Sequence, residues 1–338
     1  MIGPNAVERV RWELRAWSLN LIALALLSTL ALAQTAPQLV DGDSLLEGCL
    51  AEDACNEYIV GILGENMAEY GFALQFDPVA TGALAGKGMG LVTEVHIDTV
   101  VLGEGNDATK RLLIPPLVPR FAVGYQLGSF TYDNPYPQFS FGAFMLPPVR
   151  ILSDGVLFSI GANAGAAIPL YEHLLWGALE VDGSWAHVGA PLVGTEAQLS
   201  QLDPLKPYIE PRASDCGVIS SSCLDSFNQS AFTLRAGLSV EPLAAIFFYG
   251  RLAAAILNQR MFVVYDRTTW TITGVQPQAQ FGGGLRAGDK YQLAMGMSVA
   301  NKPAHLSTND SRLMAKFVTS FSFRFGQARY WERKEEQP

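Results

Sequence analysis

Three ionisable residues at alternate positions of one predicted strand could carry acid–base or metal chemistry. Glu94, His96 and Asp98 have the spacing i, i+2, i+4, which places their side chains on one face of the strand, about 7 Å from one to the next. An acid–base or metal cluster would need a further partner from elsewhere in the fold. The alternative is a polar ladder whose carboxylates pair with cations of a neighbouring strand. None of the four histidines lies in a nucleophile motif, so the sequence favours the ladder and predicts no enzyme.

Residues 1–33 have the composition of a secretory signal peptide. Arg9, Arg11 and Arg15 precede a mostly apolar run, which closes on Ala31-Leu32-Ala33. A basic start, an apolar middle and a small-residue site are typical of a cleaved signal. The alternative is a retained transmembrane anchor, and the polar residues inside the run argue against it. We therefore predict export with cleavage near Ala33.

The cysteines form two local pairs, Cys49 with Cys55 and Cys216 with Cys223. An oxidising compartment permits disulfides. Four cysteines allow three connectivities, of which proximity favours the two local bridges. A metal site would need thiolates and histidines at ligand spacing, and no histidine flanks either pair. The sequence predicts two disulfides, no metal site and no cofactor.

The composition predicts a membrane protein of an unusual kind. Hydrophobic residues make up 49% of the chain and charged residues only 16%, whereas soluble domains carry about 25% charge. Yet no apolar run after Ala33 reaches the roughly 18 residues that a spanning helix needs. A closed barrel is the other structure that pairs every backbone polar group in lipid. The net charge of −9 argues against nucleic acid as a partner, because phosphate binding needs a basic surface.

Alternation of apolar and polar residues supports the barrel. In residues 317–326, Phe317, Phe321 and Phe325 fall on one face while Ser320 and Arg324 fall on the other. Barrel strands alternate in this way over about ten residues. Clear alternation covers 91–101, 119–129, 175–186, 231–241, 275–286, 291–299 and 317–326, and weaker alternation covers 70–77, 138–146, 156–166, 244–256 and 261–273.

These segments predict an all-β fold, an antiparallel transmembrane β-barrel of about 12 strands with a short N-terminal helical element. A soluble β-sandwich also alternates, but its apolar face turns inward and a chain of this length would carry more charge outside. The polar face supplies the predicted lumen-lining residues, which are Glu94, His96, Asp98, Glu180, Asp182, Arg235, Arg251, Gln276, Gln278, Gln280, Arg286, Gln292, Lys316 and Arg324.

From residue 70 to 326 the chain resembles bacterial outer-membrane β-barrel proteins. The stretch SFSFRF, which ends at Phe325, is similar to the final strand of that family, where a terminal aromatic residue serves as an insertion signal. Here the chain continues, so residues 327–338 are a predicted polar tail. The stretch FDPVATGAL at 76–84 is faintly similar to the Asn-Pro-Ala element of outer-membrane fatty-acid transporters. The resemblance implies an outer-membrane location and a channel or transporter for small molecules, apolar ones among them.

The segment 34–69 differs in character from the barrel. Residues 41–69 hold eight acidic residues and no lysine or arginine. Apolar residues recur at helical spacing within 54–68, which predicts an amphipathic helix. We hypothesise that this acidic element plugs the barrel mouth against cations of the polar face, namely Arg235, Arg251, Arg286, Lys316 and Arg324. The alternative is a solvated periplasmic cap, because charge runs are usually solvated faces.

Residues 190–229 form the longest predicted connection. Barrels have short periplasmic turns and longer external loops, so this loop is expected outside, where it could dock envelope proteins. The predicted partners are outer-membrane lipid, a small-molecule cargo and envelope proteins that bind loop 190–229. The leading function is an outer-membrane channel or transporter. The alternative is a non-transporting structural barrel, or a subunit of an envelope-spanning complex.

Overall fold

The computed structural model describes residues 38–41, 71–79, 90–101, 118–127, 130–131, 134–135, 137–151, 155–171, 174–189, 226–243, 245–263, 268–287, 290–301 and 313–325. The predicted signal peptide, the predicted helix at 54–68, all four cysteines and the tail 327–338 lie outside these residues. Both predicted disulfides therefore stay predictions.

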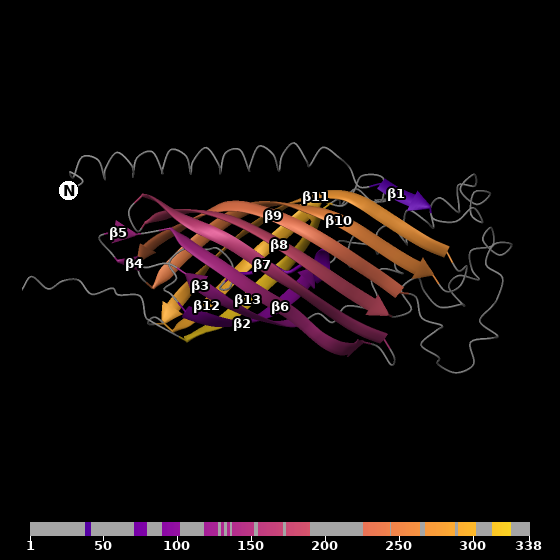
Figure 1. The fold of residues 1–338 in the computed structure, drawn as a ribbon, viewed down its shortest axis with the longest axis horizontal. Coiled ribbons are helices and arrows are strands. Elements are labelled where there is room, and N and C mark those ends of the chain that lie inside the picture. The colour runs from indigo at the N-terminus through magenta and orange to yellow at the C-terminus, as the bar shows by residue number, and fades with distance from the viewer. Residues whose placement is uncertain are drawn as a thin grey trace, which may run out of the picture.

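Ten antiparallel strands of the described chain close into one barrel (Figure 1). Each strand pairs with the next along the chain, and the last pairs with the first, from Phe325 opposite Leu91 to Ala315 opposite Val101. The barrel strands are β2 (Gly90–Val101), β3 (Val118–Leu127), β6 (Gln138–Ile151), β7 (Gly155–Tyr171), β8 (Leu175–Gly189), β9 (Ser226–Leu243), β10 (Ile246–Val263), β11 (Thr268–Ala287), β12 (Tyr291–Asn301) and β13 (Leu313–Phe325).

Three short strands complete the described elements. β4 (Phe130–Thr131) and β5 (Asn134–Pro135) pair with each other between β3 and β6. β1 (Gln38–Asp41) pairs with β11, from Gln38 opposite Thr273 to Asp41 opposite Trp270. The pairing of β12 with β11 begins only at Gln278, so β1 adds to a part of the β11 edge that β12 does not reach.

The predicted strand count of about 12 was wrong because two weak segments are not separate strands. Residues 71–74 form a helical turn, and the chain continues to Val79 without strand structure. Segment 261–273 covers the end of β10, a connection and the start of β11. Its residues 264–267 read VYDR and contain none of the glycine or proline that usually marks a turn. The predicted loop 190–229 also ends earlier, because β9 begins at Ser226.

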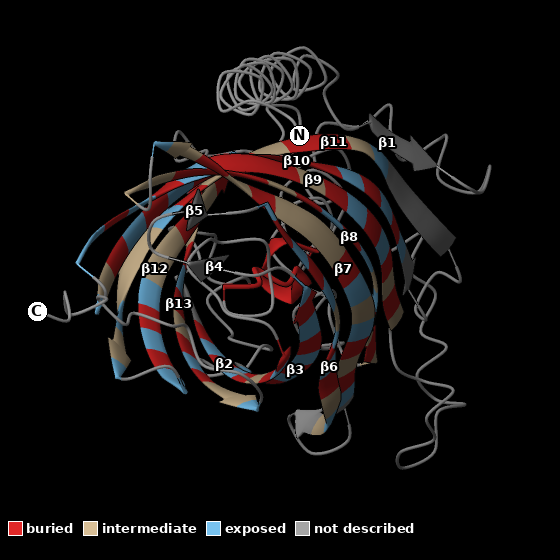
Figure 2. Ribbon diagram, turned by 60° about the vertical axis from the view of Figure 1, so that its left-hand side comes forward, coloured by how far each residue is buried: buried red, intermediate tan, exposed pale blue. Residues whose placement is uncertain are grey.

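The two faces of the barrel wall have opposite chemistry, as alternation requires. Along β13 the exposed residues include Phe317 and Phe321, each 49% exposed, whereas Lys316 and Ser320 are fully buried. Figure 2 shows the same alternation of buried and exposed bands along the strands. An apolar outside with a polar inside inverts the arrangement of a soluble protein and suits a lipid environment. Among the described residues, no helix is long and apolar enough to cross a membrane.

Placing a charge on the outer face should destabilise the barrel. Leu252, on β10, is 39% exposed and faces outward. We expect Leu252→Arg to lower the free energy of unfolding of the vesicle-inserted protein by about 2–4 kcal/mol if the residue lies near the bilayer midplane. Denaturant titration of the vesicle-inserted protein would measure this change. Leu252→Phe is the matched control, and an equal loss in both variants would argue against lipid at this face.

The two ends of the barrel differ in the length of their connections. The three longest connections, 102–117, 190–225 and 302–312, lie at one end, which we call the long-loop end. The connections 172–174, 244–245 and 288–290 lie at the other, the short-turn end, together with the start of β2 and the end of β13. By the usual asymmetry of membrane barrels, we expect the long-loop end to face outward and the short-turn end to face the periplasm.

Candidate functional site

A stretch of chain that is not part of the wall lies inside the barrel. Every residue from Gly71 to Val79 is buried, and the buried helical turn is visible within the ring of strands in Figure 2. The space beside the turn is narrow, because a Cβ added at Gly71 would lie 1.8 Å from Gln259 Nε2. We call Gly71–Val79 the inner segment.

The inner segment runs along the barrel from the long-loop end towards the short-turn end. Gly71 accepts a hydrogen bond from Gln229 near the start of β9. At the other end, Val79 packs with Phe247 and Tyr249 near the start of β10, and with Ala294 near the start of β12. These strand positions lie at opposite ends of the barrel, which sets the direction of the segment.

Cationic side chains of the wall bind the backbone carbonyls of the inner segment. Arg235 Nη2 donates to Phe76 O at 2.6 Å, and Arg251 Nη2 donates to Pro78 O at 2.7 Å. Lys316 Nζ donates to Gln75 O at 2.6 Å, and Arg120 donates to the carbonyls of Ala73 and Gln75. Buried carbonyls must find donors, and here the donors are charged, which strengthens each hydrogen bond.

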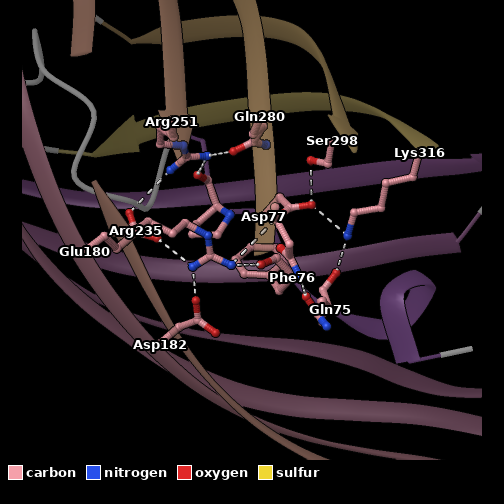
Figure 3. Close-up of polar contacts among 12 residues, drawn as sticks. Gln75, Phe76, Asp77, Glu180, Asp182, Arg235, Arg251, Gln280, Ser298 and Lys316 are labelled. Carbon is pink, nitrogen blue, oxygen red and sulfur yellow. Dashed lines mark hydrogen bonds and ion pairs between the residues drawn. The ribbon is translucent and has the colours of Figure 1, made fainter. Parts of the chain in front are cut away.

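Asp77 is the acidic anchor of the inner segment (Figure 3). Its Oδ2 lies 2.7 Å from Lys316 Nζ and accepts a hydrogen bond from Ser298 Oγ at 2.9 Å. Its Oδ1 lies 3.6 Å from Arg235 Nη2. Strands β9, β12 and β13 therefore converge on one carboxylate of the inner segment.

The wall cations also pair with carboxylates of the wall. Arg235 Nη1 lies 3.2 Å from Glu180 Oε1 and also contacts Asp182. Arg251 Nη1 lies 3.6 Å from Glu180 Oε2. Arg120 Nη1 lies 3.0 Å from Asp98 Oδ2. Each of these arginines thus divides its donors between the wall and the inner segment.

Apolar contacts fix the segment between these polar anchors. Phe76 stacks on Phe144 with ring centroids 4.1 Å apart and meets His96 edge-on at 4.7 Å. Phe72 packs with Met314 and lies 5.2 Å from Lys316 Nζ in a cation–π contact. Such aromatic pairs contribute about 0.5–1.5 kcal/mol each beyond the area they bury.

Most of the side chains proposed from the sequence to line the interior are buried. Those buried are Glu94, His96, Asp98, Glu180, Asp182, Arg235, Arg251, Gln276, Gln278, Gln280, Gln292 and Lys316. Arg286 and Arg324 are half-buried: Arg286 pairs with Glu241 at 3.1 Å, and Arg324 donates to Gln126. Arg235, Arg251 and Lys316 meet at the inner segment, whereas the contacts given for Arg286 and Arg324 join wall residues to each other.

The three residues with potential catalytic spacing lie in polar contacts of the interior. Glu94 Oε1 lies 2.5 Å from His96 Nε2 and accepts hydrogen bonds from Ser320 Oγ and the Val79 backbone N–H. Asp98 pairs with Arg120 on the neighbouring strand β3. The serine therefore donates to the carboxylate and not to the histidine, which is not the geometry of a nucleophile activated by a base. Within the described ranges, no three His, Cys, Asp or Glu side chains gather as metal ligands.

Sequence reasoning missed several residues of this site. Arg120 lies on the polar parity of 119–129, so the alternation itself contained the signal. Ser298 lies on the polar face of 291–299 in the same way. Gln229 fell inside a predicted loop, and Asp77 fell inside a predicted strand. Gln75 bonds Gln276 at 3.1 Å, a contact for which the sequence offers no signal.

A closed antiparallel wall with an apolar outside, a polar inside and connections of unequal length distinguishes this architecture from soluble β proteins. The fold is that of a bacterial outer-membrane β-barrel. No protein-family model matches the chain, and no curated protein matches its sequence.

Three solved structures with a similar fold are distant in sequence. The monoaromatic hydrocarbon channel CymD has 12% identity and a TM-score of 0.32, over 79% of this chain and 99% of its own. The toluene transporter TodX of Pseudomonas putida has 10% identity and a TM-score of 0.30, over 69% and 89%. The translocator domain of the autotransporter NalP from Neisseria meningitidis has 10% identity and a TM-score of 0.35, over 71% and 90%. Similarity of this degree concerns the barrel fold alone.

Proposed function

We propose that the protein is an outer-membrane channel for small molecules and that the inner segment holds it closed. The observation that carries this proposal is the placement of Gly71–Val79, which runs through the barrel interior as a separate stretch of chain. A barrel of ten strands is intermediate between filled eight-stranded barrels and open porins of about 16 strands. The segment occupies space that would otherwise be available for passage.

The contacts of the inner segment suit a gate because they can be exchanged for water. Its anchors are hydrogen bonds and ion pairs, and the wall arginines keep Asp98 and Glu180 as partners if the segment leaves. Charges that stay paired and become hydrated do not carry the full penalty of an isolated buried charge. The wall can therefore retain its structure in an open state.

The interior offers both polar and apolar surface to a cargo. Phe144, Phe247 and Tyr249 are buried on the inner face beside the ion pairs. Displacing the inner segment would uncover these rings together with Arg251 and Lys316. A small molecule with an apolar body and a polar group fits this lining, so we extend the proposal to apolar and amphipathic cargo.

The same proposal includes the cellular setting. We propose that the signal peptide directs export and is cleaved near Ala33. The barrel then lies in the outer membrane, where its apolar outer face contacts lipid. We also propose envelope proteins as partners, which would dock on the predicted loop 190–229. Its bounds become 190–225 because β9 begins at Ser226.

Planar-bilayer conductance tests the channel. We expect the mature chain to conduct little and a variant without residues 34–79 to show discrete openings. Retention of the barrel is checked by the shift in electrophoretic mobility on heating. If both proteins insert and shift in electrophoretic mobility on heating but neither conducts, the proposal of an aqueous channel is wrong.

A non-transporting structural barrel, or a subunit of an envelope complex, is the second candidate. The observation that favours it is the bulk of the interior, since Trp176, Phe227 and Phe247 are fully buried. These side chains would fill space that a passage needs. Absence of conductance, combined with absence of uptake of a small apolar compound into vesicles, would favour this second candidate.

A further inference from the structure

The direction of the inner segment indicates on which side of the membrane the chain before it lies. Gly71, the first residue of the segment, contacts Gln229 and lies beside Gln259. Gln229 follows the start of β9 at Ser226, and Gln259 precedes the end of β10 at Val263. Both strand ends lie at the long-loop end of the barrel, so Gly71 is the end of the inner segment that lies at the long-loop end.

The other end of the segment confirms this direction. Pro78 accepts a hydrogen bond from Arg251, and Val79 packs with Phe247. These residues follow the start of β10 at Ile246, which borders the short connection 244–245. The first wall strand, β2, also starts at this end, at Gly90. The inner segment therefore runs from the long-loop end to the short-turn end, ahead of the first wall strand in the chain.

Strand β1 places the earlier chain independently. Gln38–Asp41 pairs with Trp270–Thr273, close to the start of β11 at Thr268. That part of β11 belongs to the long-loop end, beyond the last residue of β12 that pairs with it. An unpaired strand edge exposes backbone donors and acceptors, and β1 satisfies them there. In Figure 1, β1 lies beside β11 at the end of the barrel away from β4 and β5.

We propose that β1 and the chain that links it to Gly71 lie on the outer side of the membrane, so that this N-terminal part is displayed on the cell surface. The two observations agree, because β1 and Gly71 lie at the same end of the barrel and that end carries the longest connections. Loops of that length face outward in membrane barrels. The periplasmic cap considered from the sequence is the competing arrangement, and the two differ in the side of the membrane to which the chain before Gly71 is joined.

The same topology determines from which side the inner segment can be withdrawn. Its N-terminal end is joined to the displayed chain, and its C-terminal end is joined through 80–89 to β2. A molecule outside the cell that binds the acidic stretch would act directly on the end that holds Gly71. This consequence goes beyond the channel proposal, and the topology can be tested whether or not the barrel conducts.

Surface labelling of intact cells tests the topology. An epitope inserted after Asp41 in the full chain should bind antibody equally before and after the outer membrane is permeabilised. An epitope within 190–225 is the external control, and an epitope after Pro338 is the periplasmic control. Antibody binding at the Asp41 epitope only after permeabilisation, as at Pro338, would overturn the proposal.

A second measurement covers the case in which the insertion prevents folding. Proteinase K added to intact cells that carry the unmodified protein should release peptides from residues 38–70 and leave the barrel strands intact. Mass spectrometry identifies the peptides. Survival of residues 38–70 on intact cells under conditions that cut an external loop would show that this stretch lies elsewhere.

Discussion

In a planar bilayer, the Lys316→Glu variant should open frequently while the unchanged protein stays closed. Lys316 Nζ lies 2.7 Å from Asp77 Oδ2 and donates to Gln75 O. Glutamate at this position removes these donors and sets two carboxylates against each other at a fully buried position. Breaking a buried ion pair costs about 3–5 kcal/mol, which shifts the closed-to-open ratio by about 100-fold or more. Single-channel recording of the open probability measures this shift.

Two further variants separate gating from general damage. Phe317→Leu changes the neighbouring residue on the lipid-facing side of β13, where Phe317 is 49% exposed, and should leave the open probability unchanged. The double variant Asp77→Lys with Lys316→Asp restores opposite charges and should recover part of the closure. If Lys316→Glu inserts, shifts on heating and remains as quiet as Phe317→Leu, then the Asp77–Lys316 pair does not hold the channel closed.

The Arg235→Met variant should lose more stability than the same substitution at an exposed arginine of the adjacent strand. Arg235 contacts three carboxylates, those of Asp77, Glu180 and Asp182. It also donates to the carbonyl oxygen of Phe76. Methionine keeps the volume and removes the charge, which leaves buried carboxylates without their cation. We expect a loss of about 3–5 kcal/mol in the free energy of unfolding, measured by denaturant titration in lipid vesicles.

Matched controls identify the cause of that loss. Arg260, on the adjacent strand β10, is exposed, and Arg260→Met should change stability by less than about 0.5 kcal/mol. Arg235→Lys keeps the charge but not the planar fork that spans several acceptors, so it should fall between the two. Equal effects of Arg235→Met and Arg260→Met would show that the buried cluster contributes nothing specific.

Lys316 and Arg235 lie in different parts of one network of polar contacts. Lys316 joins a wall strand to the inner segment, whereas Arg235 joins wall to wall as well as wall to segment. Loss of the first contact should release the segment while the barrel persists. Loss of the second should weaken the barrel itself. A channel in which both variants merely unfold would not have a separable gate.

The alternation of residue types was enough to predict the class of fold and most of its wall. Phe317 and Phe321 point outward and Lys316 and Ser320 point inward because lipid outside and a polar interior select the residue at every second position. That selection is local, so it can be read from the sequence. It failed at Tyr70–Asp77, where aromatic and small or polar residues alternate by chance in a stretch that is not part of the wall.

In the inner segment, tertiary contacts and not the local sequence pattern determine the conformation of the chain. Its anchors come from residues far away in the chain: Arg120 is 45 residues from Gln75, and Lys316 is 244 residues from Phe72. No pattern within the segment encodes those partners. The sequence predicted that an acidic element within 34–69 would meet interior cations, among them Arg235, Arg251 and Lys316. These three cations do bind a segment in the interior. That segment, however, follows 34–69 in the chain and contributes only the carboxylate of Asp77.

By itself, the sequence determined that the chain is a membrane barrel, because composition and a period of two depend on the solvent on each face of a strand. The tertiary structure alone decided the number of strands, because a hairpin without glycine or proline reads as one continuous segment. It also decided which stretch fills the interior and in which direction it runs. Those features depend on closure of the wall around the segment, because closure brings together β2, β3, β9, β10, β12 and β13. These strands are far apart in the chain, so no short stretch of sequence contains the information.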